Sequence, residues 1–385
     1  MLKAYKYRLY PNKNQKILIE KHFGCVRYIY NKSLETKIKA YQESNTSLSC
    51  INLINGLLMQ EKEQHDWLQE VYSQSLQMSI RNLDNAFKRF FKQHKGFPNF
   101  KKKCSNQSVQ FPQGVKIINN HVYLPKIGEV SFVQDRQFFG KIKTVTISKT
   151  STNKYFVSIL VDNEKTLPSK PKVEESTVIG LDLGLKSYIV TSNGDKVDNP
   201  KFLKKSRDRL KVLQRRASHK VLGSKNRSKA NLRVTKLHER IKNQRNDFLH
   251  KLSSKIVREN QTICIEDLSV ENMLKNHSLA QAIGDASWRT FTGMLSYKSE
   301  WYGKNLVKIG RYEASTKICS VCGNVNRGLT LGDREWVCES CKTVHDRDVN
   351  AAINIKKFGL ITYSKRYTRQ ELPEELSELS GSQKR

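Results

Sequence analysis

Hydrophobic and polar residues alternate over the first ten positions of the chain, which predicts a half-buried strand with a basic outer face. The apolar side consists of Tyr5, Tyr7 and Leu9, and lysine or arginine lies between them. Over residues 19–34, and again over 73–92, the apolar positions recur at spacings of three and four. That period is typical of helices with one buried face, so a helical region is expected after the strand.

Alternation returns between residues 108 and 162 and predicts a group of short strands. The first strand has no partner unless it joins this group. We therefore expect an N-terminal β-barrel formed by residues 1–10 and 105–163, with a helical domain, residues 11–104, inserted into it. The polar segment 164–176 has the composition of an exposed linker.

A second domain is predicted to begin at residue 177, which makes the chain an α/β multidomain protein. An apolar strand there carries Asp182 and continues through a turn into a second strand, the opening of an RNase H-like sheet. Residues 202–258 follow as two long basic helices, and a short buried strand then ends in Glu266. A helix is expected after Asp348, and residues 359–385 are predicted to form a polar, disordered tail.

Charge narrows the choice of partner. The 385 residues include 69 Lys+Arg and 36 Asp+Glu, so the formal net charge is +33. Such an excess repels itself unless a polyanion neutralises it, which favours nucleic acid. A basic protein that coats ribosomal RNA or chromatin is the plainer alternative. No long apolar run indicates a membrane span, and the first residues lack the apolar core of a signal peptide, so we expect a cytoplasmic protein without a membrane partner.

Clusters of cations mark the candidate nucleic-acid contacts. On the first of the two basic helices they far outnumber the nearby acids, which favours contact with a phosphate backbone over a merely solvated face. These residues are Lys204, Lys205, Arg207, Arg209, Arg215 and Arg216. Arg27 and Arg81, in the N-terminal helical region, are further candidates. Phe87 and Phe90 in the 73–92 stripe are expected in the core, with base stacking as the less favoured interpretation.

Four of the eight cysteines form two Cys-x-x-Cys pairs separated by fifteen residues, a spacing that predicts a zinc site. They are Cys319, Cys322, Cys338 and Cys341. Four thiolates complete a tetrahedron around one Zn²⁺ and leave no open position, so a structural ion is expected. The other cysteines are scattered, which fits a reducing compartment better than a disulfide framework.

Three carboxylates stand at apolar strands or at a helix start, namely Asp182, Glu266 and Asp348. Hard oxygen ligands of this kind hold two Mg²⁺ ions in phosphodiesterases, where one ion activates water and the other stabilises the leaving oxygen. Each acid alone could equally be a helix cap or an ion-pair partner. Asp346 competes with Asp348 as the third ligand, and spacing does not choose between them.

In combination these features resemble the TnpB (OrfB) proteins of insertion sequences, which are relatives of the type V CRISPR effector nucleases. The resemblance covers nearly the whole chain except the tail. The segments that carry it are GLDLGLK at 180–186, IEDL at 265–268, YKSEWYG at 297–303, STKICSVCG at 315–323 and HDRDVNAAINI at 345–355.

The resemblance implies an RNA-guided DNA endonuclease of the prokaryotic cytoplasm, associated with the nucleoid. A RuvC nuclease domain, residues 177–316 and 343–358, would use Asp182, Glu266 and Asp348 as Mg²⁺ ligands and cut both DNA strands. A zinc ribbon at 317–342 would be inserted into it and bind the target nucleic acid.

The N-terminal barrel would be a wedge domain and the helical insertion a recognition domain. Together they would hold a guide RNA derived from the transposon end and read a short motif beside the double-stranded DNA target. Ser73 and Gln77 are hypotheses for the motif-reading residues. Three alternatives stay open: a compact type V CRISPR effector, a non-cleaving RNA-guided DNA-binding regulator and a strand-transfer transposase. The three acids, all present, argue against the regulators, in which they are eroded.

Overall fold

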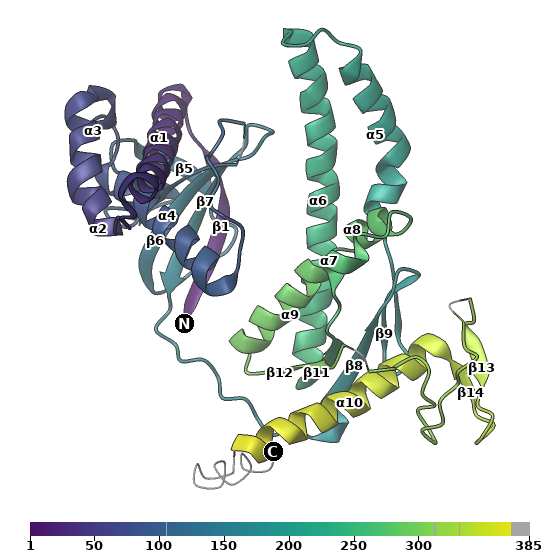
Figure 1. Ribbon diagram of the computed structural model, residues 1–385. Helices are drawn as coiled ribbons and strands as arrows, with labels where there is room; N and C mark the ends of the chain where they lie inside the picture. Colours follow the sequence, from purple (N-terminus) through teal and green to yellow (C-terminus); the bar gives the residue numbers. More distant parts are fainter. Residues whose placement is uncertain (105, 312, 331, 371–385) are drawn as a thin grey trace. The chain divides into compact units, whose positions relative to one another are not determined.

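A computed structural model describes residues 1–104, 106–311, 313–330 and 332–370 of the chain (Figure 1). The chain divides into two compact units, Met1–Thr166 and Leu167–Arg385. Each unit has its own sheet and its own hydrophobic core. The predicted linker over residues 164–176 lies at the boundary between them.

The first unit is built on a seven-stranded antiparallel sheet with the order β2-β6-β7-β1-β5-β4-β3. Its strands are β1 (Leu2–Tyr10), β2 (Gln107–Phe111), β3 (Lys116–Ile118), β4 (His121–Leu124), β5 (Gly128–Val133), β6 (Lys141–Lys149) and β7 (Tyr155–Asp162). Strand β1 pairs with β5 and β7, so the first strand does join the later group. Strands β2 and β3 stand at the two ends of this order, so no ladder among the described strands closes the predicted β-barrel, which stays a prediction.

Helices cover one face of this sheet. They are α1 (Lys13–Ser44), α2 (Cys50–Asn52), η1 (Leu53–Leu57), α3 (Leu58–Gln64), η2 (Asp66–Leu68) and α4 (Ser73–Gln93). A capping box starts α1, because Asn12 and Gln15 each bond the other's backbone N–H. The helical insertion predicted for residues 11–104 is present. It is not a separate domain, because side chains such as Ile19 and Ile80 share one core with the sheet residues Phe111 and Val157.

The second unit contains a mixed five-stranded sheet with the order β10-β9-β8-β11-β12. Its strands are β8 (Val178–Leu183), β9 (Ser187–Thr191), β10 (Lys196–Asp198), β11 (Thr262–Glu266) and β12 (Asn305–Ile309). Strands β8, β9 and β10 are antiparallel, whereas β11 lies parallel between β8 and β12. The predicted opening by an antiparallel hairpin is therefore confirmed.

Helices pack around this sheet, and a small two-stranded ribbon precedes the last of them. The helices are η3 (Glu175–Thr177), α5 (Phe202–Ser218), α6 (Lys225–Glu259), α7 (Val270–Met273), α8 (Ala280–Ala286), α9 (Trp288–Trp301) and α10 (Arg347–Gln370), and the ribbon strands are β13 (Glu335–Val337) and β14 (Val344–Asp346). Helices α5 and α6 form a long hairpin that projects from the sheet (Figure 1). None of the described helices is both long and apolar enough to cross a bilayer.

The predicted tail begins later than expected. Helix α10 continues through residue 359 to Gln370, because apolar side chains of its later turns, including Phe358 and Leu360, pack against the buried strand residues Val307 and Ile309. A disordered tail from residue 359 is therefore wrong for 359–370. Residues 371–385 lie outside the described residues.

Candidate active site and metal centre

Two neighbouring strands and one helix bring the three candidate acids together. Asp182 lies in β8, Glu266 ends β11, and Asp348 lies in the first turn of α10. Leu181 faces Ile265 in the parallel β8–β11 ladder, so the acids that follow them are adjacent across the sheet. Helix α10 packs on β8 and brings its acidic first turn to the same place.

The electrostatics of Asp182 link it to the other two acids. Burial, followed by the negative charges of Glu266 and Asp348, raises the pKa of Asp182 to about 7, and Arg347 partly opposes the shift. A carboxyl group behaves in this way when it is buried close to other negative charges. The site is therefore suited to a cation that would neutralise all three carboxylates.

Hydrogen bonds orient the other two acids. Ser315 Oγ donates to Glu266 Oε1 at 2.6 Å. Asp348 Oδ1 accepts from Nε and an Nη of Arg347 at 3.1 and 3.0 Å, and Arg334 lies 3.6 Å from its second oxygen. These contacts hold Glu266 and Asp348 in place without burying them fully.

Asp346, the competing acid, has a different task. Its Oδ1 accepts hydrogen bonds from the backbone N–H groups of Asp348 and Val349, both at 3.0 Å. Its second oxygen accepts from Lys196 Nζ at 2.5 Å. Asp346 thus caps the start of α10 and is neutralised by a lysine, which leaves Asp348 as the better candidate ligand.

Two glycines allow α10 to lie directly against the sheet. A Cβ atom on Gly180 would come within 2.1 Å of the carbonyl oxygen of Ala352 and 2.7 Å of the Lys356 nitrogen. Near the other end of the contact, a Cβ on Gly359 would lie 2.2 Å from Cys264 Sγ. Only the absence of side chains at these positions permits this approach, which sets the height of the helix above β8 and β11.

The four predicted cysteines form a second candidate centre. Their Sγ atoms all lie within 4.8 Å of one another, with Cys319 and Cys341 at 3.6 Å and Cys322 and Cys338 at 3.5 Å. Zn–S bonds of about 2.3 Å in a tetrahedron separate the sulfur atoms by about 3.8 Å. The spacing therefore fits Zn²⁺. Within the described ranges no other set of His, Cys, Asp and Glu ligand atoms converges as closely, the three acids included.

Two neighbouring side chains, His345 and Thr343, contact the sulfur atoms of this centre. Nε2 of His345 lies 3.0 Å from Cys319 Sγ, where an N–H can donate to the sulfur. Hydrogen bonds from the side chain and backbone of Thr343 lower the pKa of Cys341 to about 6. The buried His345 was not among the predicted site residues, although its place directly before Asp346 is visible in the sequence.

Two buried asparagines of α10 form hydrogen bonds with the backbone around the first cysteine pair. Asn350 accepts from the backbone N–H of Ser320 and donates to the carbonyl of Ile318, both at 2.8 Å. One turn later, Asn354 donates to the same carbonyl at 2.6 Å. The first cysteine pair therefore sits on the helix that carries Asp348. Sequence reasoning missed this role, although a spacing of four residues in a helix was a usable signal.

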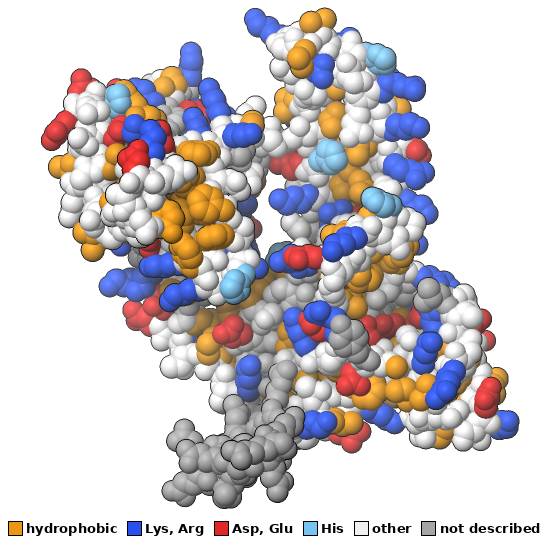
Figure 2. Space-filling view, in the orientation of Figure 1, with side chains coloured by type: hydrophobic (Ala, Val, Ile, Leu, Met, Phe, Trp, Pro, Cys, Tyr) orange, Lys and Arg blue, Asp and Glu red, His pale blue; other side chains and the backbone are white. Residues whose placement is uncertain are grey.

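The predicted nucleic-acid contacts occupy separate places. Figure 2 shows lysine and arginine side chains along the α5–α6 hairpin, and all six candidates on α5 are exposed. Ser73, Gln77 and Arg81 follow one another turn by turn on α4, and Ser73 accepts a hydrogen bond from Lys62. Arg27 lies on α1 and donates to Gln107 at 2.9 Å.

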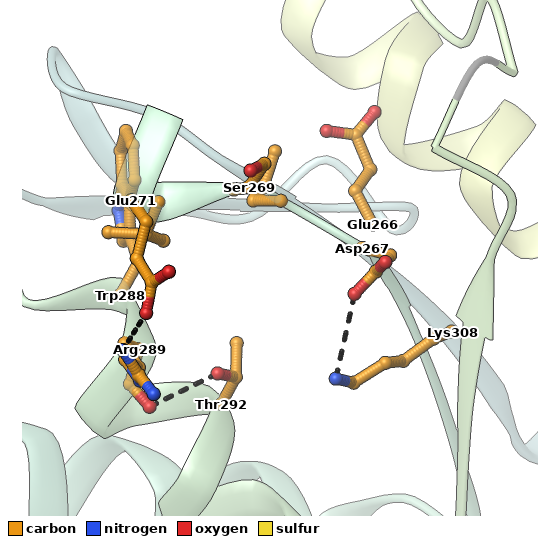
Figure 3. Close-up of a pocket in the computed structure, with 10 residues that line it drawn as sticks. Glu266, Asp267, Ser269, Glu271, Trp288, Arg289, Thr292 and Lys308 are labelled. Atoms are coloured by element: carbon orange, nitrogen blue, oxygen red, sulfur yellow. Dashed lines mark hydrogen bonds and ion pairs between the residues drawn. The ribbon is translucent and has the colours of Figure 1, made fainter. Parts of the chain in front are cut away.

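A cavity of about 190 Å³ adjoins Glu266. It is lined in part by Trp288, Arg289 and Lys308 (Figure 3). Figure 3 shows the Glu266 carboxylate directed away from Asp267, which faces Lys308 at 3.7 Å. The space beside the acid is thus bordered by an indole ring and two cations.

Sequence comparison identifies the family. A model described as "Probable transposase" matches residues 158–277, one described as "Cas12f1-like, TNB domain" matches 288–355, and a "Helix-turn-helix domain" model matches 1–46. A Streptomyces pristinaespiralis protein named "Putative RNA-guided DNA endonuclease" is 40% identical over 93% of this chain and 89% of its own. The chain belongs to the TnpB (OrfB) family. Escherichia coli "Putative RNA-guided DNA endonuclease InsQ" is 30% identical to this TnpB protein, over 93% and 92% of the two chains.

Structural comparison agrees at the level of the fold. The solved structure titled "Cryo-EM structure of the Cas12f1-sgRNA-target DNA complex" contains a chain that matches this TnpB protein with a TM-score of 0.59. The match covers 92% of this chain and 98% of the other at 15% identity, so it shows the shared fold alone. In the region of the helix-turn-helix model, this TnpB protein has strand β1 and the single helix α1.

Proposed function

We propose that this TnpB protein is an RNA-guided DNA endonuclease whose reaction takes place between β8, β11 and the start of α10. The observation that carries the proposal is that Asp182 and Glu266 lie on adjacent strands and Asp348 lies in the first turn of the helix packed on β8, although the three come from distant parts of the sequence. The names of the Streptomyces and Escherichia relatives support an RNA guide and a DNA target.

The chain's own residues would supply the framework for hydrolysis. When bound, two Mg²⁺ ions would activate a water molecule and stabilise the leaving 3′ oxygen of the phosphodiester. Asp182, Glu266 and Asp348 would hold these ions, and Asp182 must first release its proton. Ser315 keeps Glu266 oriented through its hydrogen bond. Both DNA strands would be cut in turn at this one site.

Other parts of the molecule would bind nucleic acid or support the site. The second unit would be the RuvC domain, in which the four cysteines would hold one structural Zn²⁺ beneath α10. The α5 cations would contact phosphates, and zinc-ribbon residues would contact target nucleic acid. The first unit would act as the wedge and recognition region, where Ser73, Gln77 and Arg81 are candidates for reading the target-adjacent motif.

The decisive experiment begins with the RNA. The protein is co-expressed with its native flanking DNA, and the copurifying RNA is sequenced. We expect one RNA that ends in a variable guide beside the 3′ end of the gene. A processed repeat–spacer RNA would assign the protein to CRISPR effectors instead, and the absence of any specific RNA would refute guided cleavage.

Cleavage is then tested with a reprogrammed guide and a plasmid target. Asp182→Ala should abolish cutting of both strands while RNA-guided target binding is retained, because it removes a ligand and leaves the basic surfaces intact. Asp195→Ala is the matched control, because Asp195 is exposed in the turn that follows the neighbouring strand β9. Full cutting by the Asp182 variant would disprove the site assignment.

A further inference from the structure

The apolar stripe predicted for residues 73–92 divides into two parts with different surroundings. Leu76, Ile80 and Leu83 in its first half are fully buried. In its second half, rings gather at the surface in what we term the phenylalanine cluster, which consists of Phe87, Phe90, Phe91 and Phe97. The expectation that the stripe is core holds for Phe87, which packs against the small core of Tyr30, Leu34 and Leu83, but only in part for the half-buried Phe90.

Local backbone geometry assembles the cluster. Helix α4 ends at Gln93, and His94 adopts a left-handed conformation with φ of 50°. The backbone N–H of Lys95 then donates to the carbonyl of Arg89, which reverses the chain over the helix end. The reversal places Phe97 in edge-on contact with Phe90, with ring centroids 5.4 Å apart.

The cluster is exposed to a degree that is unusual for large apolar side chains. Phe91 is 69% exposed and Phe97 is 46% exposed. Phe91 also contacts Phe90, with ring centroids 5.0 Å apart, so the exposed ring of Phe91 packs against a second ring. A supported, exposed aromatic surface indicates a binding partner, because single scattered side chains would not build such a group.

Charge indicates what kind of partner this is. Residues 85–103 contain seven lysines and arginines and no acid. Lys88 pairs with Asp84 at 2.9 Å, but among the described residues no ion pair involves Arg89, Lys92 or Lys95. Two copies of this surface would repel each other through their cations, which disfavours self-association. An anionic partner with accessible π-faces fits both the rings and the charges.

Single-stranded nucleic acid has this chemistry, whereas the bases of a DNA duplex are stacked inside it. Unpaired RNA bases are commonly bound on aromatic side chains. We propose that the phenylalanine cluster is a stacking platform for an unpaired base of bound RNA, with Phe91 under the base and Arg89, Lys92 and Lys95 near the adjacent phosphates. The proposal rests on the proposed function only in taking this RNA to be the guide.

The test measures binding of short RNA by the full-length protein purified free of nucleic acid. Fluorescence anisotropy is recorded with a labelled oligouridine, an oligothymidine of equal length and a fully paired RNA hairpin, across a series of salt concentrations. Phe91→Ala should weaken oligouridine binding by about 5-fold or more, the scale of one base–aromatic stack. Hairpin binding should stay unchanged, and Phe91→Tyr should restore the affinity.

Salt dependence separates stacking from charge. Phe91→Ala should leave the slope of log K against log salt unchanged, whereas Lys92→Ala should reduce it by about 0.7. Phe139→Ala is the matched control, because Phe139 is 78% exposed in the same unit and is not among the rings that contact the cluster in the part of the chain that the structure describes. An equal loss in this control would show a nonspecific apolar effect and overturn the proposal.

Three other outcomes would refute the proposed stacking platform or its RNA ligand. Unchanged oligouridine affinity in Phe91→Ala would refute the platform, and a loss confined to oligothymidine would refute RNA as its ligand. A dimer that dissociates on substitution of Phe91, seen by mass photometry, would make the cluster an interface between copies. Because the probe is oligouridine, failure to find a guide RNA in the cell would refute the proposed function without deciding this test.

Discussion

The substitution Gly180→Ala would test how the sheet positions helix α10. Gly180 lies in β8 two residues before Asp182 and directly beneath α10. The added Cβ would stand 2.1 Å from the carbonyl oxygen of Ala352. Carbon–oxygen contacts between neighbouring backbones are about 3.3 Å or longer. The helix must therefore retreat by about 1.2 Å, or the strand must yield by the same amount.

Both consequences can be estimated. Overpacking of this kind costs about 1–3 kcal/mol. At roughly 2–4 °C per kcal/mol for a domain of 150–250 residues, the melting temperature should fall by several degrees. Because Asp348 moves with α10, a shift near 1 Å should also lower the rate of cleavage by about 100-fold. The loss should persist at temperatures where the variant remains folded.

The assay combines thermal melting with single-turnover cleavage of a guided plasmid target, measured well below the melting transition. Gly293→Ala serves as the control, because a Cβ on this helical glycine would meet nothing within 4 Å. It should melt at or above the wild-type temperature and cleave normally. A Gly180→Ala protein with wild-type stability and rate would refute the reasoning. Reduced stability with a normal cleavage rate would show that the distance of α10 from the sheet does not determine how Asp348 acts in the reaction.

Three further outcomes are expected. The folded-state pKa of Asp182 is raised to about 7, so the metal-free protein loses stability as pH rises from about 4 to 7. Asp182→Asn should therefore stabilise the metal-free protein by a few kcal/mol at pH 8 and by less at pH 5, measured by thermal melting. For the same reason, calorimetry should find Mg²⁺ affinity rising up to about tenfold per pH unit below pH 7 and levelling off above it. Cys338→Ser should remove the zinc detected by mass spectrometry. It should also reduce cleavage, because the cysteine centre is hydrogen-bonded to α10. Unchanged zinc content and activity would disprove a structural ion. Asn354→Ala removes the donor to the Ser315 carbonyl and leaves the Ile318 carbonyl with Asn350 alone, so it should lower stability by about 1–3 kcal/mol with zinc retained. An unaltered melting curve would disprove this role of Asn354.

The sequence by itself was sufficient for several features that depend on local spacing or on residue type. The period of the apolar positions identified β1, α1, α4 and the β8–β9 hairpin, because burial of one face follows directly from helical or extended geometry. The two cysteine pairs predicted one closed group of thiols, because their spacing matches known zinc sites. The acidic segments were sufficient to indicate the family.

Tertiary structure alone decided the features that depend on which segments meet. Asp346 and Asp348 are chemically identical and two residues apart, and only the cap at the start of α10 distinguishes them. The apolar stripe of α4 is uniform in sequence, yet Phe90 in its second half is only half-buried and the neighbouring Phe91 is 69% exposed. The raised pKa of Asp182 arises from burial and then from charges on segments 84 and 166 residues away along the chain. Such effects act through space, and a linear pattern records only what neighbours in the chain impose.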